Sequence, residues 1–406
     1  VTAQQMRLLF GFGLHPLAEL REESLAGPGL TERDYRAARR LGVPYKVYTS
    51  GATTFQVQVA QRIAEHAASL GHPQDYPVAA ADRARIRSQV AAEFFRAEHG
   101  RDPRDARELS GAVSKLSRPR TSAVGGFDLT FSPVKSVSTL WAIAPPEVAA
   151  QIELAHHDAV TDALAFIEKH ALYTREGTNG VRQVDVTGLV AAAFTHRDSR
   201  AGDPDLHTHV AVSNKVRALS GQWLALDGRP LFRSTVAASE VYNTRPEGYL
   251  GAALAVRFAD RGDAAVGVRA VREIVGIPAA LKEGFSARRT AIQARVAELS
   301  KAFHAEHGRE PSSPEALALS QQATLETRQA KHEPRSLAEQ RQAWHTQAAV
   351  ILGDTHTVSD VIATALSGHG IAAPEVTDAW IAQSAAAIIA TVSATRSTWQ
   401  RTHVFA

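Results

Sequence analysis

Cysteine is absent from the 406 residues of the chain. Its absence excludes disulfide bonds, thiolate metal ligands and cysteine nucleophiles. No apolar run reaches the roughly 18–20 residues that a membrane-spanning helix needs, and no basic segment followed by an apolar one indicates a secretory leader. These absences favour a cytoplasmic protein without a membrane span. They leave histidine, carboxylate and hydroxyl side chains to carry any chemistry.

A large excess of charge is missing as well. The chain has 45 Lys and Arg against 42 Asp and Glu, so its formal net charge is only +3. That balance permits an acidic partner such as nucleic acid without requiring one. Apolar residues make up 44% of the chain and charged residues 21%, which is typical of a soluble globular protein. The length is enough for two or three domains.

Three histidines gather in one stretch, residues 188–216. An apolar run at 189–195 leads into His196, and turn-forming residues separate it from His207 and His209. This pattern predicts an antiparallel hairpin. Because side chains alternate along a strand, His207 and His209 share a face, and the hairpin returns His196 beside them. Three imidazoles on one face predict a site for a divalent metal, and the ligand type alone favours Zn, Ni or Cu.

A carboxylate lies on a second predicted strand. Residues 127–132 alternate apolar and polar side chains, which predicts a half-buried strand with Asp128 on its polar face. We expect this strand to be central in the sheet, with the Asp128 carboxylate within reach of the histidines. A metal with a nearby carboxylate predicts assisted attack on an ester or phosphate. Lys135 follows the strand, and we interpret it as a surface lysine rather than a contact to a DNA backbone.

The order of the predicted elements favours an α+β fold. Strand patterns gather in the middle of the chain, between helical patterns at both ends. We therefore predict a central antiparallel sheet that carries the His₃ metal site, flanked by helices, with a helical C-terminal region. Residues 11–29 are rich in Gly and Pro and are predicted as loop, and Asn179-Gly180 indicates a hairpin turn. Nearly all of the chain after Phe232 is predicted as helix, in which Pro246 is an anomaly.

One motif occurs twice. Residues 95–103, FRAEHGRDP, match residues 303–311, FHAEHGREP, and each copy is followed by a further helical pattern. A glycine that ends a helix and a proline that bars its continuation predict two similar helical hairpins. Shared capping chemistry accounts for the repeat without a shared function.

Two longer motifs carry a resemblance to a known family. Residues 126–138, GFDLTFSPVKSVS, and residues 196–209, from His196-Arg197-Asp198 to His207-Thr208-His209, resemble the signatures of MobF-class conjugative relaxases of the TrwC/TraI type. The resemblance also includes residues 1–9 and 280–292, and so most of residues 1–330.

The resemblance implies an HUH endonuclease, a DNA-nicking transesterase. Such an enzyme would cut one strand of single-stranded DNA at a plasmid transfer origin through a tyrosine–DNA intermediate, and would work with the conjugation machinery in plasmid mobilisation. It implies Mg or Mn as the metal. It further implies His196, His207 and His209 as ligands and Asp128 as the catalytic carboxylate that assists the tyrosine or a ligand histidine.

The nucleophile departs from the family pattern. In the family the tyrosine precedes the segment that residues 1–9 resemble, and none of the seven tyrosines here matches it, with Tyr35 the best stand-in. We therefore expect residues 1–335 to be a relaxase domain that lacks its first strand and tyrosine segment, with a helical part at about 233–335. Residues 336–406 are expected to be a helical linker towards a helicase domain. Residues 1–406 by themselves are expected not to nick DNA.

Two other interpretations stay open at this point. One is a non-cleaving module that binds single-stranded DNA on the same scaffold. The other is an unrelated His₃ metalloenzyme such as a cupin-like oxygenase. Cupins also place His-x-His on a strand, but they usually add a glutamate and use an all-β barrel, which the helix-rich pattern disfavours.

Overall fold

The computed structural model of the chain describes residues 1–25, 29–45, 53–73, 78–117, 123–262, 270–328, 333, 335–353, 357–368 and 376–405. These residues form two compact units, Val1–Pro44 with Val124–Arg288 and His332–Ala406, and Tyr45–Ala123 with Arg289–Lys331. Helices predominate and the strands form small antiparallel sheets, so the predicted α+β class is confirmed. None of the helices in the described residues is long and apolar enough to cross a membrane. The predicted domain boundary near Arg335 stays a prediction.

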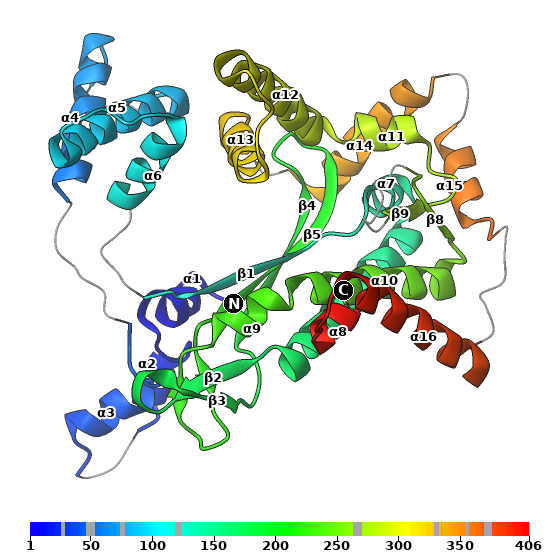
Figure 1. Ribbon diagram of the computed structural model, residues 1–406, viewed down its shortest axis with the longest axis horizontal. Coiled ribbons are helices and arrows are strands. Elements are labelled where there is room, and N and C mark those ends of the chain that lie inside the picture. The colour runs from blue at the N-terminus through cyan, green and yellow to red at the C-terminus, as the bar shows by residue number, and fades with distance from the viewer. Residues whose placement is uncertain are drawn as a thin grey trace. The chain divides into compact units, whose positions relative to one another are not determined.

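The main sheet has three strands, which cross the first unit in Figure 1 in the order β1 (Gly126–Phe131), β5 (Pro204–Ser213) and β4 (Ala191–Asp198). Both pairings are antiparallel, and His196 lies directly opposite His207. The predicted histidine hairpin is therefore confirmed. The prediction that Asp128 lies on a central strand is wrong. β5 takes the centre because it pairs with its hairpin partner β4 on one edge and with β1 on the other.

The two faces of this sheet differ. Along β5, residues 204–212 alternate between buried and half-buried, and Leu206, Val210 and Val212 face inward. Two long helices, α8 (Pro146–His170) and α10 (Thr235–Leu254), pack against each other and share a core with these strands. We call the side with the inward residues the helix face. The side with the three histidines is the histidine face.

Helix α7 (Lys135–Ile143) follows β1 directly and is buried from Ser136 to Ile143. It packs against β5 and against α14 (Leu337–Leu352), where Trp141 and Trp344 are both fully buried with ring centroids 5.4 Å apart. A segment near the end of the chain therefore completes the core next to the histidine hairpin.

Three two-stranded sheets complete the strands of the described residues. β2 (Tyr173–Glu176) and β3 (Arg182–Asp185) are joined through η2 (Thr178–Gly180), where Asn179 and Gly180 both have positive φ. This geometry confirms the predicted Asn-Gly turn. The other two pairs are β6 (Val216–Arg217) with β7 (Trp223–Leu224), and β8 (Phe258–Asp260) with β9 (Arg272–Ile274). The last pair interrupts the region predicted as nearly all helix.

The chain begins with four short helical segments, α1 (Ala3–Met6), the π-helix η1 (Arg7–Phe12), α2 (Ala18–Glu23) and α3 (Glu32–Arg39). Helix α2 lies inside residues 11–29, so the loop prediction for that whole stretch is wrong. Residues 18–23, AELREE, are good helix formers that the surrounding Gly and Pro obscured. After α3, Gly42 has φ of +67°, and a Cβ at this position would lie 2.3 Å from the carbonyl oxygen of Trp223.

The remaining helices of the first unit follow β7 in the sequence. Helices at Leu337–Leu352 and Val358–Leu366 agree with the helical character predicted for residues 336–406, and Pro246 lies buried inside α10. The elements not yet given are α9 (Gly228–Arg233), α11 (Ala279–Gly284), α15 (Val358–Leu366), α16 (Asp378–Thr395) and α17 (Arg401–Phe405).

The second unit contains the repeated motif. Its helices are α4 (Thr54–Ser69), α5 (Ala80–His99), α6 (Ala106–Ser117), α12 (Ala287–His307) and α13 (Ser313–Glu326). In the first copy Arg101 lies over the Phe95 ring and pairs with Glu108 at 2.7 Å. In the second copy Arg309 repeats both contacts with its own phenylalanine and glutamate. The two predicted helical hairpins are confirmed, and each copy of the motif makes the same arginine–phenylalanine and arginine–glutamate contacts.

Candidate metal centre

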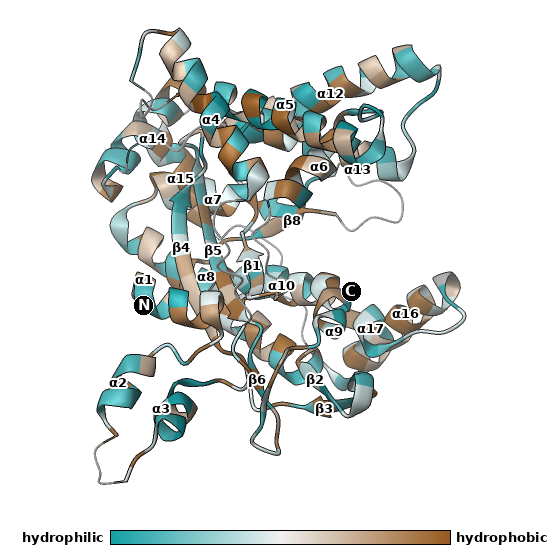
Figure 2. Cartoon of the chain, turned by 90° about the vertical axis from the view of Figure 1, so that its left-hand side faces the viewer, coloured by the Kyte–Doolittle hydropathy of each residue, from teal (hydrophilic) through white to brown (hydrophobic). Residues whose placement is uncertain are grey.

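The three histidines lie together on the histidine face. The ring centroid of His196 is 5.2 Å from that of His207 and 5.3 Å from that of His209, and the last two centroids are 5.2 Å apart. The hairpin register produces this cluster, because His196 is paired across the strands with His207 and His209 is two residues further along β5. In Figure 2, β4 and β5 are more hydrophobic at one end of the hairpin and more hydrophilic at the other.

The spacing of the rings fits a shared metal ion. Metal–nitrogen bonds of about 2.1 Å, with each ring centre about 1 Å beyond its nitrogen, separate ring centres by roughly 5 Å around one ion. Within the described residues, however, no three His, Asp or Glu side chains form a preformed ligand group. The fold therefore places three imidazole rings at a suitable separation, but their nitrogen atoms do not yet point at one common position for an ion.

The hydrogen bonds of two rings fix which nitrogen is available. Nδ1–H of His207 donates to the carbonyl oxygen of Asp205 at 2.7 Å. Nδ1–H of His209 donates to the carboxylate of Asp128 at 2.9 Å, and the hydroxyl of Thr130 lies 3.1 Å from the same nitrogen. In a neutral imidazole the other nitrogen, Nε2, then carries a lone pair. An outer partner on one nitrogen is the usual arrangement of a metal-binding histidine.

Asp128 reaches the histidines although its strand is at the edge of the sheet. Its Cα pairs with that of Ala211, two residues beyond His209 on the same face of β5, so the contact is diagonal across the strands. The Asp128 side chain is 59% exposed. A carboxylate in this position can orient the His209 ring and still face a solvent-borne substrate.

The tip of the hairpin is anchored from α7. The ammonium group of Lys135 donates to the carbonyl oxygen of Pro204 at 2.6 Å. Burial lowers the pKa of Lys135, and the carboxylates of Asp205 and Asp203 oppose that shift. The interpretation of Lys135 as a surface lysine is therefore wrong. Lys135 is the first residue of α7, and from there its side chain reaches inward to the start of β5.

A second anchor comes from the C-terminal part of the first unit. The carboxylate of Asp198, at the end of β4, accepts hydrogen bonds from Gln340 at 2.7 Å and from Arg335 at 3.3 Å. Nε1–H of Trp344 donates to the carbonyl oxygen of Gly202 in the tip. Sequence reasoning did not connect Arg335, Gln340 or Trp344 with the hairpin, because no local pattern links positions that are more than 130 residues apart.

The hydroxyls of Tyr242 and Tyr249 lie away from the histidine face. Tyr242 is buried on the helix face and shares a hydrogen bond with His156, while Tyr249 donates to Asp162 on α8. Tyr35 is a half-buried residue of α3. Tyr48 and Tyr76 lie outside the described residues.

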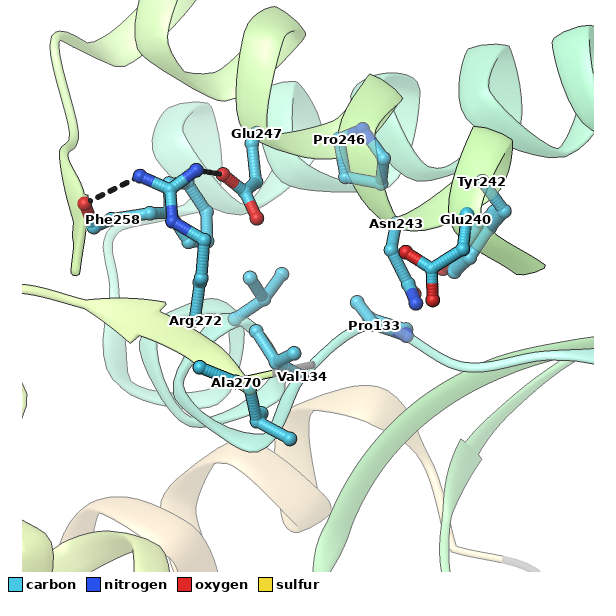
Figure 3. Close-up of a pocket in the computed structure, with 12 residues that line it drawn as sticks. Pro133, Val134, Glu240, Tyr242, Asn243, Pro246, Glu247, Phe258, Ala270 and Arg272 are labelled. Atoms are coloured by element: carbon cyan, nitrogen blue, oxygen red, sulfur yellow. Dashed lines mark hydrogen bonds and ion pairs between the residues drawn. The ribbon is translucent and has the colours of Figure 1, made fainter. Parts of the chain in front are cut away.

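A separate cavity of about 150 Å³ lies between the loop after β1, helix α10 and the β8–β9 pair (Figure 3). Pro133, Tyr242 and Pro246 contribute to its wall, and Arg272 pairs with Glu247 at one side. None of the three histidines lines this cavity. The cavity is therefore distinct from the histidine face, on which His196 and Asp128 are exposed.

Comparisons with known proteins agree with the sequence motifs. The model of the family described as TrwC relaxase matches residues 1–351. The multifunctional conjugation protein TraI of Escherichia coli is 33% identical over 216 residues, which is 50% of this chain and 11% of that protein. TraI of Escherichia coli strain K12 is 36% identical over 153 residues, which is 36% of this chain and 8% of that protein. The chain thus spans only a small part of the curated relatives that it matches.

Solved structures with similarity to the chain include the conjugative relaxase TrwC in a metal-bound complex with OriT DNA. That structure is 27% identical, covers 71% of this chain and 88% of its own, and has a TM-score of 0.48. TrwC with a 27-mer DNA that comprises the recognition hairpin and the cleavage site is also 27% identical, covers 73% of this chain and 96% of its own, and has a TM-score of 0.46.

Proposed function

The chain belongs to the TrwC relaxase family, and from this premise we propose that it is the relaxase domain of a conjugative transfer protein. Its substrate in this proposal is single-stranded DNA at a plasmid transfer origin, which the parent protein nicks at one site on one strand. The observation that carries the proposal is the cluster of three histidines with Asp128 on one open sheet face. An open face suits a polymer substrate better than a closed pocket does.

We propose that His196, His207 and His209 hold one divalent metal ion through ring nitrogens. For His207 and His209 that nitrogen is Nε2, because Nδ1–H already has an acceptor. When bound, the ion would withdraw charge from a non-bridging oxygen of the scissile phosphate. The family resemblance implies Mg or Mn, whereas imidazole ligands favour Zn, Ni or Cu. A titration with each metal decides between them.

Asp128 is proposed as the carboxylate that assists the reaction. By accepting Nδ1–H of His209 it holds the ring in one tautomer and raises the basicity of Nε2. Its exposed oxygen atoms can also accept a proton from an attacking hydroxyl group at the phosphate. Asparagine in this position would keep the size of the side chain and lose its charge.

The nucleophile in the proposed reaction is a tyrosine hydroxyl, as in the family. Tyr242 and Tyr249 are poor candidates, because their hydroxyls are held by His156 and Asp162. An attacking atom must lie about 3–3.5 Å from the phosphate and in line with the leaving group. Because none of the seven tyrosines matches the position of the nucleophile in the family, we propose that residues 1–406 alone bind the DNA without nicking it. Tyr35 remains the residue to test.

The metal proposal is tested first by titration of the full chain with Mn²⁺, read by the electron paramagnetic resonance of the free ion. We expect one tight site, which is lost in His196→Ala, His207→Ala and His209→Ala. His304→Ala is the matched control, because this histidine is exposed on α12 and distant in sequence from the cluster. Uptake of Mn²⁺ that survives the three substitutions would remove the proposed ligand set.

The DNA proposal is tested with labelled single strands from transfer origins, incubated with Mn²⁺ and run on a denaturing gel. We expect sequence-dependent binding and no covalent protein–DNA band for residues 1–406. A covalent band that disappears in Tyr35→Phe would make Tyr35 the nucleophile. Equal affinity for origin and random strands would contradict the proposed substrate.

The cupin-like interpretation is not supported. The histidines lie on an open three-stranded sheet, and the family membership assigns the chain to a different class. The non-cleaving binding module remains the second candidate for residues 1–406. The positions of the Tyr242 and Tyr249 hydroxyls favour it, and the gel assay separates it from an active nickase.

A further inference from the structure

Two adjacent histidines of α8 contact the back of the strands that carry the candidate metal ligands. Nε2 of His156 shares a hydrogen bond of 2.8 Å with the hydroxyl of Thr208 on β5. Nε2 of His157 shares one of 3.1 Å with the hydroxyl of Thr195 on β4. The two threonines are paired across the strands, and their hydroxyls are 3.1 Å apart. One helix thus binds both strands of the hairpin through side-chain hydrogen bonds.

The two threonines hold special positions in the sequence of the strands. Thr208 lies between His207 and His209, and Thr195 immediately precedes His196. Because side chains alternate along a strand, a threonine on the helix face sets the backbone from which its neighbours project on the histidine face. A shift or twist of β5 at Thr208 would move both flanking imidazoles.

The contact at Thr208 is buried and fully paired. His156 and Thr208 are each 1% exposed, and the second ring nitrogen of His156 shares a 2.8 Å hydrogen bond with the hydroxyl of Tyr242, which is 3% exposed. The surrounding core is apolar and includes Val210. Apolar side chains would tolerate small displacements there, whereas a buried hydrogen-bonded set is satisfied in one arrangement only.

We propose that His156, together with Thr208 and Thr195, positions the metal-binding histidines from behind the sheet. These residues would never touch the metal ion or the DNA. They would act by fixing the strand register and the local twist that hold the three imidazoles at a common spacing. The inference rests on the proposed metal role of His196, His207 and His209.

The test compares variants of one buried threonine in the full chain. Thr208→Val keeps the shape and removes the hydroxyl, whereas Thr208→Ser keeps the hydroxyl. The matched control is Thr174→Val on β2, because Thr174 is also fully buried and donates to the carbonyl oxygen of Ala225, outside the main sheet. Thermal unfolding of each variant measures the structural cost of the lost hydrogen bond.

The functional readout is the dissociation constant for Mn²⁺. Loss of a group hydrogen-bonded to a metal ligand commonly weakens metal binding about 10- to 100-fold. Thr208 contacts His156 and Thr195 and acts on the ligands through the strand, so we expect Thr208→Val to weaken Mn²⁺ binding by about tenfold, at the lower end of that range. Thr208→Ser and Thr174→Val should bind as the wild type does, although Thr174→Val should be as thermally destabilised as Thr208→Val. Equal Mn²⁺ affinity of wild type and Thr208→Val, or equal weakening in Thr174→Val, would overturn the proposal.

A second readout needs no metal and so separates this inference from the proposed function. With ¹⁵N-labelled histidine in the metal-free protein, we expect His207 and His209 each to give one set of ring signals. Those signals should broaden or split in Thr208→Val and persist in Thr208→Ser. Absence of Mn²⁺ uptake by the wild type would refute the metal role. Unchanged ring signals in Thr208→Val would refute the positioning role.

Discussion

The stability of the protein should fall steeply as the pH is lowered from 7 to 5, and His156 should account for a defined part of that fall. Burial lowers the pKa of His156 to about 4, with smaller contributions from the nearby His157 and His207. The unfolded chain gives an ordinary histidine pKa of about 6.5. As the pH falls, the unfolded state therefore takes up the proton first.

The sign and size follow from this difference. A histidine with a lowered pKa in the folded state contributes stability above its unfolded pKa, and that contribution is lost as the pH falls towards the folded pKa. Between pH 7 and pH 5 the loss from this one group is about 2 kcal/mol. The cause is structural, because the ring is 1% exposed and would have to be charged next to Thr208 and Tyr242.

The assay is urea unfolding at several pH values between 5 and 7, with the free energy of unfolding obtained at each pH. His156→Gln cannot titrate in this range. It should be less stable than the wild type at pH 7, but its decline between pH 7 and pH 5 should be smaller by about 2 kcal/mol. His304→Gln is the control for the loss of a histidine at an exposed position. Parallel declines in wild type and His156→Gln would refute the reasoning.

Three further outcomes are expected. In a full-length parent protein, Asp128→Ala should reduce the initial rate of metal-dependent nicking of a labelled origin strand by about 10- to 100-fold. An unchanged rate would exclude the assisting role of Asp128. Binding to single-stranded DNA, followed by fluorescence anisotropy, should weaken linearly in log–log form with salt, by a slope of about −0.7 per phosphate contact, and a flat salt dependence would contradict backbone recognition. Gly42→Ala should lower the free energy of unfolding by roughly 2 kcal/mol or more, because the added Cβ would lie 2.3 Å from the Trp223 carbonyl oxygen. A variant as stable as the wild type would show that the backbone around residue 42 relaxes freely.

The hairpin and its histidine face were predictable because the determinants are local. Alternation fixes the face of His207 and His209, and the turn-forming residues after His196 fix its return beside them. The same rule gave the polar face of β1, on which Asp128 and Thr130 lie. Local capping and turn signals also sufficed for the Asn179-Gly180 turn and for the two repeated hairpins.

Strand order and long-range anchoring were decided only by the tertiary structure. Alternation does not reveal which strand pairs with which, so the central position of β5 and the edge position of β1 could not be read from residues 126–131. The inward turn of Lys135 depends on the carbonyl oxygen of Pro204, 69 residues away. A long side chain has the same sequence pattern whether it lies in solvent or against a distant carbonyl.

The sequence alone was enough to predict the α+β class and the family, and it pointed to His196, His207, His209 and Asp128 as candidate site residues. It did not determine how those residues are held. The contacts of His156 with Thr208, of Gln340 with Asp198 and of Trp344 with Gly202 each join positions far apart in the chain. Such contacts arise from packing of whole elements, and packing depends on the shapes of all neighbours at once. Short motifs therefore predicted the candidate site residues, and contacts with the rest of the fold hold those residues in place.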